Sequence, residues 1–263
     1  MLDLWIGKAF HEIVSVPTLL AILAIGATVG FLGGLFGKGG SAIATPLLAL
    51  VGIPPYIAVA SPLPATIPST LVAARTYFRA DHVDWRLVRW TVAVGFPATL
   101  LGAYATRWVS GSTLVVATEV ILTALGLRFL VRPGLPHEVV RDPTWMRTRM
   151  VVVAVAVGVT AGLLANSGGF LFAPLFVVVL HRRIKDAFGS SLAIGAALAI
   201  PGALMHAALG HIDWAVVVVF GMASMPLSYV GARVALRTHS VKLERLYGTV
   251  IATLGTTLLV VMH

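Results

Sequence analysis

The sequence contains no cysteine and few charged residues. Without cysteine the chain has no structural disulfide, no thiolate metal site and no cysteine nucleophile. Lys, Arg, Asp and Glu together make up 11% of the 263 residues, whereas a soluble globular domain carries about 25% charged residues. So little charge excludes an ordinary soluble domain.

The sequence also lacks the short signatures of common enzymes. Lys38 is followed by glycine, so residues 37–41 do not form a Walker A loop, which needs Ser or Thr after the lysine. There is no Gly-x-Ser-x-Gly motif and no Cys/His/Asp cluster with metal-ligand spacing. We therefore expect no enzyme activity, no cofactor and no metal. Transport by such a chain would be driven by gradients.

Long apolar runs take the place of charge. Hydrophobic residues make up 58% of the chain, and residues 13–36 and 187–212 contain no Asp, Glu, Lys or Arg. Both runs exceed the roughly 20 apolar residues that a transmembrane helix needs. The first run begins late and lacks a small-residue cleavage site, so it is expected to be mature structure and not a signal peptide.

The formal net charge of +9 comes from basic residues in short loops between the apolar runs. In a soluble protein this charge could indicate nucleic-acid binding, but here the preference of basic loops for the cytoplasmic side accounts for it. We therefore expect no nucleic-acid partner. The lipid bilayer is the expected environment.

The chain contains an internal duplication. Residues 34–46 resemble residues 162–174, each a glycine-rich stretch that ends in proline. The motif His-x-Asp-Trp at 82–85 recurs at 211–214, and the same register aligns Ser61 with Ser190. A register that holds across most of each half predicts two repeats. We place the first membrane repeat at 1–131, a cytoplasmic linker at 132–148 and the second repeat at 149–263.

Each half contains five apolar segments. The second one is short in both halves and would reach only roughly 20 Å, against a hydrocarbon core of about 30 Å. It is therefore predicted to re-enter or to complete a broken helix. The segments are 13–36, 40–52, 56–78, 86–106 and 112–131 in the first half, and 149–165, 168–180, 187–209, 213–236 and 243–262 in the second. This pattern predicts an all-α polytopic membrane protein with about 8–10 transmembrane segments.

Basic residues mark different loops in the two halves. The loop around 79–89 is basic while its counterpart at 210–213 is not, and the loop at 181–185 is basic while its counterpart at 52–55 is not. Because basic loops face the cytoplasm, equivalent loops are expected on opposite sides of the membrane. This predicts an inverted-topology repeat, which is common in transporters.

The two glycine-rich breaks are the predicted substrate site. Glycine lets backbone approach a ligand closely, and a helix that starts after a break points free N–H groups and the positive end of its dipole at the gap. Two facing breaks would bind an anion near the membrane midplane. The predicted substrate-binding residues are Lys38, Gly39, Gly40, Ser41, Ser61, Asn166, Ser167, Gly168, Gly169, Ser190 and Ser191.

Each of these residues has a structural alternative. Glycine patches also allow membrane helices to pack closely. Lys38 is the only formally charged residue between Ile13 and Ala74, which favours a function because buried charge is costly, but its side chain could instead extend to the surface. The three serines could cap helices as well as bind a ligand oxygen.

The two His-x-Asp-Trp motifs stand where loops enter helices. Asp84 and Asp213 are predicted N-caps, and Trp85 and Trp214 are predicted interfacial anchors. The histidines of the motifs are candidates for a proton relay or gate, because imidazole changes charge near neutral pH.

Two further polar residues lie within apolar segments. Glu119 is a candidate proton carrier, with an ion pair to an arginine such as Arg75 as the alternative. His206 aligns with Tyr77 and either lines the path or forms an internal hydrogen bond. The predicted coupling or gating residues are therefore Glu119, His82, His206 and His211.

The paired breaks resemble those of the sulfite exporter TauE/SafE family, also called the 4-toluene sulfonate uptake permease family. The first break reads Gly-Leu-Phe-Gly-Lys-Gly-Gly and closes at Pro46; the second reads Gly-Leu-Leu-Ala-Asn-Ser-Gly-Gly and closes at Pro174. The resemblance covers nearly the whole chain. It implies a secondary, proton-linked carrier of sulfite, sulfonates or related small anions in a prokaryotic inner membrane. Lys38 opposite Asn166 makes the predicted site asymmetric.

Two other functions fit the same sequence. In a non-transporting membrane scaffold or assembly factor, the glycine breaks would serve only packing. A passive anion channel would carry the anion without proton coupling. The anion, its direction and the coupling ion are left open by the sequence.

Overall fold

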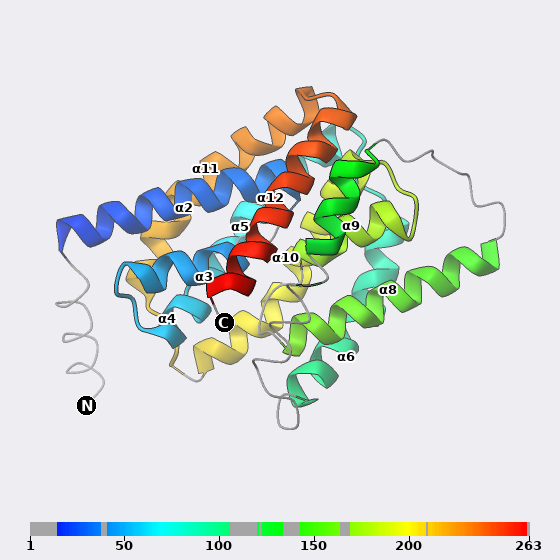
Figure 1. Cartoon of the computed structure of the whole chain (residues 1–263). Helices are drawn as coiled ribbons and strands as arrows, with labels where there is room; N and C mark the ends of the chain where they lie inside the picture. Colours follow the sequence, from blue (N-terminus) through cyan, green and yellow to red (C-terminus); the bar gives the residue numbers. More distant parts are fainter. Residues whose placement is uncertain are drawn as a thin grey trace.

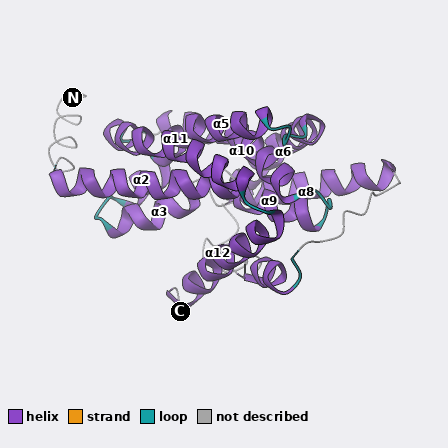
Figure 2. Ribbon diagram, turned by 90° about the horizontal axis from the view of Figure 1, so that it is seen from above, coloured by secondary structure: helices purple, strands orange, loops and turns teal. Residues whose placement is uncertain are grey.

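The computed structural model of the chain describes residues 15–37, 41–105, 120, 123–133, 143–163, 169–208 and 210–261. These residues form α-helices joined by turns and contain no strand (Figures 1 and 2). The helices are α2 (Val16–Phe36), α3 (Ser41–Leu50), α4 (Pro55–Ala60), α5 (Pro62–Arg79), α6 (Trp85–Ala105), α8 (Pro143–Leu163), α9 (Gly169–Val178), α10 (Ile184–Ala208), α11 (Trp214–Arg237) and α12 (Ser240–Val261). The predicted all-α fold class is confirmed.

Four helical stretches in the described part of the chain are long and apolar enough to span a membrane. They are Val16–Phe36, Ile57–Arg79, Ile184–Ala208 and Trp214–Arg237. Each corresponds to an apolar segment expected from the sequence. α8 begins at Pro143, inside the stretch 132–148 that was expected to be a linker. Proline is well suited to the first position of a helix, which accounts for the start of α8 at this residue.

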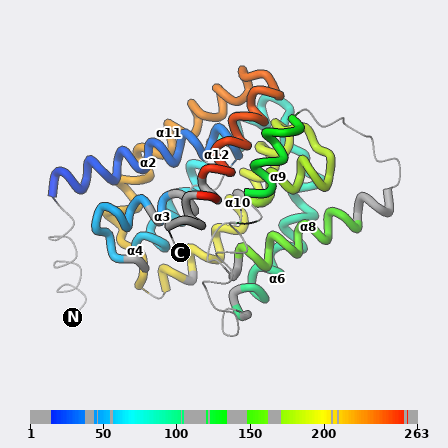
Figure 3. The backbone as a smooth tube through the Cα atoms, viewed as in Figure 1, coloured from blue at the N-terminus to red at the C-terminus, as the bar shows by residue number. Residues whose placement is uncertain are grey.

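The second segment of each half forms a short helix, as predicted. α3 and α9 have ten residues each, so each extends roughly 15 Å, about half of a hydrocarbon core. The tube in Figure 3 shows α3 following α2 and then leading through α4 into α5. In Figure 1, α2 begins at the left edge and α8 at the right edge, so the first helices of the two halves reach the middle from opposite ends.

α2 has clear start and stop signals. The Ser15 hydroxyl accepts a hydrogen bond from the Thr18 N–H at the first turn, which is the usual role of an N-cap serine. The helix ends at Gly37, whose φ of 65° is left-handed and favours glycine. A Cβ on Gly37 would also lie 2.5 Å from the Phe188 Cα of α10. α2 therefore ends at Gly37, the residue at which it contacts α10 of the other half.

The halves interlock through their first and fourth helices. α2 of the first half packs along α11 of the second, and α8 of the second half packs along α6 of the first. Gly26, Gly30 and Gly34 place α2 against the α11 backbone, and a Cβ on Gly26 would lie 2.6 Å from the Phe220 carbonyl oxygen. Such small-residue spacing lets membrane helices approach closely. The packing role considered for glycine patches therefore applies to these α2 glycines.

The remaining long helices fill the space between these two pairs. α5 packs on both α10 and α11, and α12 joins through Tyr247, whose buried ring lies 5.4 Å from the Phe36 ring and 5.1 Å from the Phe188 ring. The two halves therefore share one core. The opposite orientation of the two repeats in the membrane stays a prediction.

The close contact between α2 and α11 gives a stability prediction. Gly30→Ala places a methyl group against the Ser224 backbone, and we expect this overpacking to cost about 1–3 kcal/mol and to lower the melting temperature of the purified protein. Gly195→Ala is the matched control, since no atom lies within 4 Å of its added Cβ. Equal melting temperatures for the two variants would contradict the packing described here.

Candidate functional site between the two halves

Seven of the predicted site residues lie outside the described residues: Lys38, Gly39, Gly40, Asn166, Ser167, Gly168 and Glu119. The helices that follow the glycine breaks are described. α3 begins at Ser41 and α9 begins at Gly169, so a short helix starts directly after each break. This is the local arrangement that the sequence predicted, with the N-terminal end of each short helix adjoining the break.

Gly37, the last described residue before Lys38, contacts α10 of the other half. The Ser191 hydroxyl donates to the Gly37 carbonyl oxygen over 2.8 Å and to the Phe188 carbonyl oxygen over 3.0 Å. Ser191 is fully buried. Ser191, which was predicted to bind substrate, therefore donates a hydrogen bond to the carbonyl oxygen of Gly37, the residue directly before Lys38.

Ser61 and Ser190 form two reciprocal contacts between the halves. The Asp213 N–H donates to the Ser61 hydroxyl oxygen over 2.9 Å, and the Asp84 N–H donates to the Ser190 hydroxyl oxygen over 3.0 Å. Both serines are fully buried. Since the repeat register aligns Ser61 with Ser190 and Asp84 with Asp213, the two bonds are equivalents. Each hydroxyl accepts here and keeps its own hydrogen for a second acceptor.

The same aspartates are the helix caps that the sequence predicted. The Leu87 N–H donates to Asp84 Oδ1 over 3.0 Å at the start of α6, and Asp213 Oδ1 accepts from Ala215 and Val216 at the start of α11. Trp85 and Trp214 are exposed, as interfacial anchors should be.

Hydroxyl groups near the α2 glycines form a polar cluster that the sequence analysis missed. Thr66, Ser69 and Thr70 of α5 and Ser224 and Ser228 of α11 surround a cavity of about 10 Å³, which is about the space of one water molecule. The Ser228 hydroxyl donates across to the Ser69 carbonyl oxygen over 2.7 Å. The spacing of hydroxyls by three and four positions on an apolar helix was the signal that could have revealed this face.

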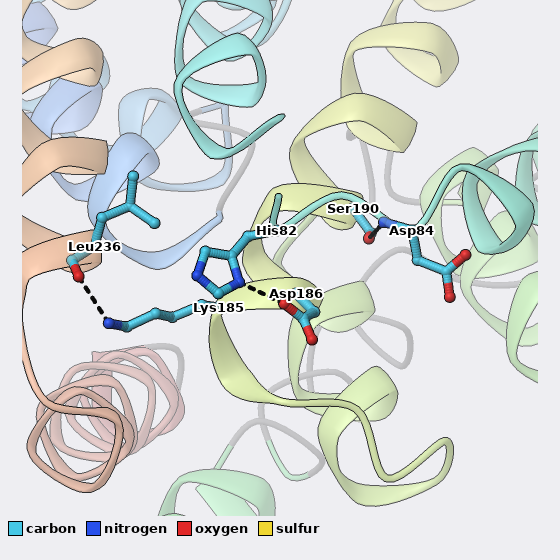
Figure 4. Close-up of polar contacts among 6 residues, drawn as sticks. All are labelled: His82, Asp84, Lys185, Asp186, Ser190 and Leu236. Atoms are coloured by element: carbon cyan, nitrogen blue, oxygen red, sulfur yellow. Dashed lines mark hydrogen bonds and ion pairs between the residues drawn. The ribbon is translucent and has the colours of Figure 1, made fainter. Parts of the chain in front are cut away.

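Ionic contacts join the loop at 80–84 to the start of α10. His82 Nδ1 lies 2.6 Å from Asp186 Oδ1 (Figure 4), and Arg182 Nη2 lies 2.9 Å from Asp84 Oδ2. Lys185 Nζ donates to the Leu236 carbonyl oxygen of α11 over 2.7 Å, as Figure 4 also shows. The two ion pairs link both halves at the basic end of the molecule, and the Lys185 contact joins α10 to α11 within the second half.

The equivalent contact at the other end lacks counterparts of Arg182 and Asp186. In the repeat register these two residues correspond to Ile53 and Ile57, and among the described residues no ion pair accompanies the Ser61 hydrogen bond. His211 instead has its Nδ1 3.4 Å from Nδ1 of His206. His206 and His211, two of the predicted coupling residues, therefore lie side by side, whereas His82 pairs with the carboxylate of Asp186.

A family model described as sulfite exporter TauE/SafE matches residues 22–258 of the chain. A "Probable membrane transporter protein" of Xylella fastidiosa is 28% identical and covers 90% of this chain and 93% of its own. The "Probable membrane transporter protein YjnA" of Bacillus subtilis is 24% identical and covers 90% and 98%. No solved structure matches the chain.

Proposed function

The chain belongs to the sulfite exporter TauE/SafE family and is a multi-pass integral membrane protein of a prokaryotic membrane; from this premise we propose that it is a secondary transporter of sulfite or an organosulfonate. The observation that carries the proposal is the hydrogen bond from Ser191 of the second half to the carbonyl oxygen of Gly37, the residue directly before Lys38. A substrate bound at that junction would touch both halves at once.

In this proposal the anion binds between the two glycine breaks. Lys38 supplies the positive charge, and free N–H groups at the starts of α3 and α9 supply hydrogen bonds and the positive ends of two helix dipoles. The glycines at 39, 40 and 168 let the backbone approach the sulfur oxyanion. Ser61 and Ser190 accept hydrogen bonds from Asp213 and Asp84, so we propose their hydroxyl hydrogens as further donors.

Movement between inward-open and outward-open states would break different contacts at the two ends of the molecule: ion pairs at the basic end, and the Ser61 hydrogen bond at the other. Opening at the basic end requires the His82–Asp186 and Arg182–Asp84 pairs to separate. The His82–Asp186 contact is the one that we propose to be linked to proton movement. Glu119, His206 and His211 are the other proposed coupling or gating residues.

The two alternative functions predict different behaviour. A scaffold or assembly factor would transport no sulfite and would not depend on Lys38. A passive channel would conduct the anion, but a pH gradient alone would not drive accumulation. The names of the relatives indicate a membrane transporter and not an enzyme, which favours the carrier.

Lys38→Ala tests the proposed anion site. In proteoliposomes with an imposed pH gradient, we expect wild-type protein to move sulfite and the variant to lose roughly tenfold or more of the flux, since a charge-assisted contact to the anion is lost. Lys242→Ala removes the same charge from an exposed position near the start of α12 and should retain flux. Equal flux in all three proteins would contradict the site.

Asp186→Asn tests the proposed proton linkage at the basic end. We expect transport to depend much less on pH in this variant, because Asn cannot form the charged pair with His82. The substrate should be an alkyl sulfonate, whose own charge does not change near neutral pH. Asp81→Asn is the control, since Asp81 is exposed on the neighbouring turn with a φ of 61° that Asn tolerates. An unchanged pH profile for Asp186→Asn would count against this linkage.

A further inference from the structure

A groove of about 800 Å³ lies on the outside of the molecule, between α5, α6 and α10. Its walls are almost entirely apolar and include Ile67, Leu71 and Phe78 of α5 and Ile200 of α10. Leu71, Phe78 and Ile200 are 51%, 52% and 47% exposed. In a membrane protein such outward apolar side chains face lipid. From Ile67 to Phe78 the groove follows α5 for roughly 16 Å, at about 1.5 Å per residue.

Two arginines enter this apolar groove near its basic end. Arg75 comes from the last part of α5 and Arg89 from the first part of α6, and both side chains are exposed. Among the described residues neither has an acidic partner; the contact recorded for Arg89 is from Nε to the Trp85 carbonyl oxygen, over 3.4 Å. The groove therefore offers two guanidinium groups to an anion.

A second hollow continues from the same arginine. It has a volume of about 510 Å³, shares Arg89 and Ala93 with the groove, and adds Arg86 and Trp90. The apolar groove thus opens into a basic, aromatic corner beside the loop at 80–84. Arginine with tryptophan at such a position is typical of the membrane interface, where lipid headgroups lie.

The fold itself does not require these arginines. In the repeat register Arg75 corresponds to Leu204, Arg86 to Ala215 and Arg89 to Val218, so the equivalent face of the second half carries no guanidinium group. The preference of basic residues for one side of the membrane explains why arginines occur at this end. It does not explain why they line an apolar groove, since Arg79 and Arg183 are at the same end and outside it.

We infer that this groove binds an acidic phospholipid. One acyl chain lies along α5 toward Ile67, and the phosphate lies between the guanidinium groups of Arg75 and Arg89. Arginine forms charge-assisted, often bidentate, hydrogen bonds with phosphate. An acidic lipid brings no cation of its own to this corner, whereas a choline headgroup would place a third positive charge beside the two arginines.

Trp85 lines the groove and gives a direct readout of lipid occupancy. Purified protein is placed in nanodiscs of mixed phosphatidylglycerol and phosphatidylcholine in which only one of the two lipids has brominated acyl chains. The quenching assigned to Trp85 is the difference between wild-type protein and Trp85→Phe. We expect brominated phosphatidylglycerol to quench Trp85 more strongly than brominated phosphatidylcholine. The expected preference for binding phosphatidylglycerol over phosphatidylcholine is roughly thirtyfold, from the attraction of two basic residues for an anionic lipid.

The variant Arg75→Gln/Arg89→Gln should lose this preference for phosphatidylglycerol. The control Arg79→Gln/Arg183→Gln removes the same charge at the same end of the molecule and should keep it. Equal quenching by the two lipids in wild-type protein would overturn the inference. An equal loss of preference in both double variants would overturn it as well, because it would indicate a general effect of surface charge.

Native mass spectrometry of the wild-type protein provides a test that needs no variant. Protein released from detergent that contains equal amounts of the two lipids should retain phosphatidylglycerol in preference to phosphatidylcholine. Equal retention of both lipids would contradict a specific acidic-lipid site. A dimer peak without bound lipid would assign the groove to a second copy of the chain and would equally overturn the inference.

Discussion

Lipid offers no hydrogen bonds, so backbone polar groups at the ends of membrane helices depend on partners supplied by the protein or by bound water. This chain meets that constraint by pairing buried serines of one half with backbone N–H groups of the other. Ser61 accepts from Asp213 and Ser190 accepts from Asp84. Because each bond joins a helix of one half to a helix cap of the other, these two N–H groups bind side chains of the opposite half.

The two halves also interlock through the close packing of α2 on α11 and of α8 on α6. Glycines on these helices bring backbones together, and the fully buried Ser191 then reaches the Gly37 carbonyl oxygen at the end of α2. The glycine break that follows Gly37 therefore starts where the two halves meet. A substrate that enters this junction would compete with the contacts that hold the halves together, which is how a carrier couples binding to movement.

Much of the fold was predictable from the sequence because apolar runs, caps and glycine breaks act locally. The short α3 and α9, the caps at Asp84 and Asp213 and the exposed Trp85 all followed from such local patterns. The pairing of His82 with Asp186 was not predicted, since 104 positions separate the two residues and only the packing of α10 against the 80–84 loop brings them together. For the same reason Ser61 and Ser190 were predicted to cap or to bind substrate, without the aspartates that they contact.

In the proposed transport function, a sulfur oxyanion binds between the two glycine breaks. Selenite has the shape and charge of sulfite, and selenium gives an anomalous X-ray signal that identifies its position directly. In crystals grown with selenite, we expect one anomalous peak between residues 38–40 and 166–168, next to the side chain of Lys38. A peak only at the exposed arginines, with none between the two breaks, would contradict anion binding at this site.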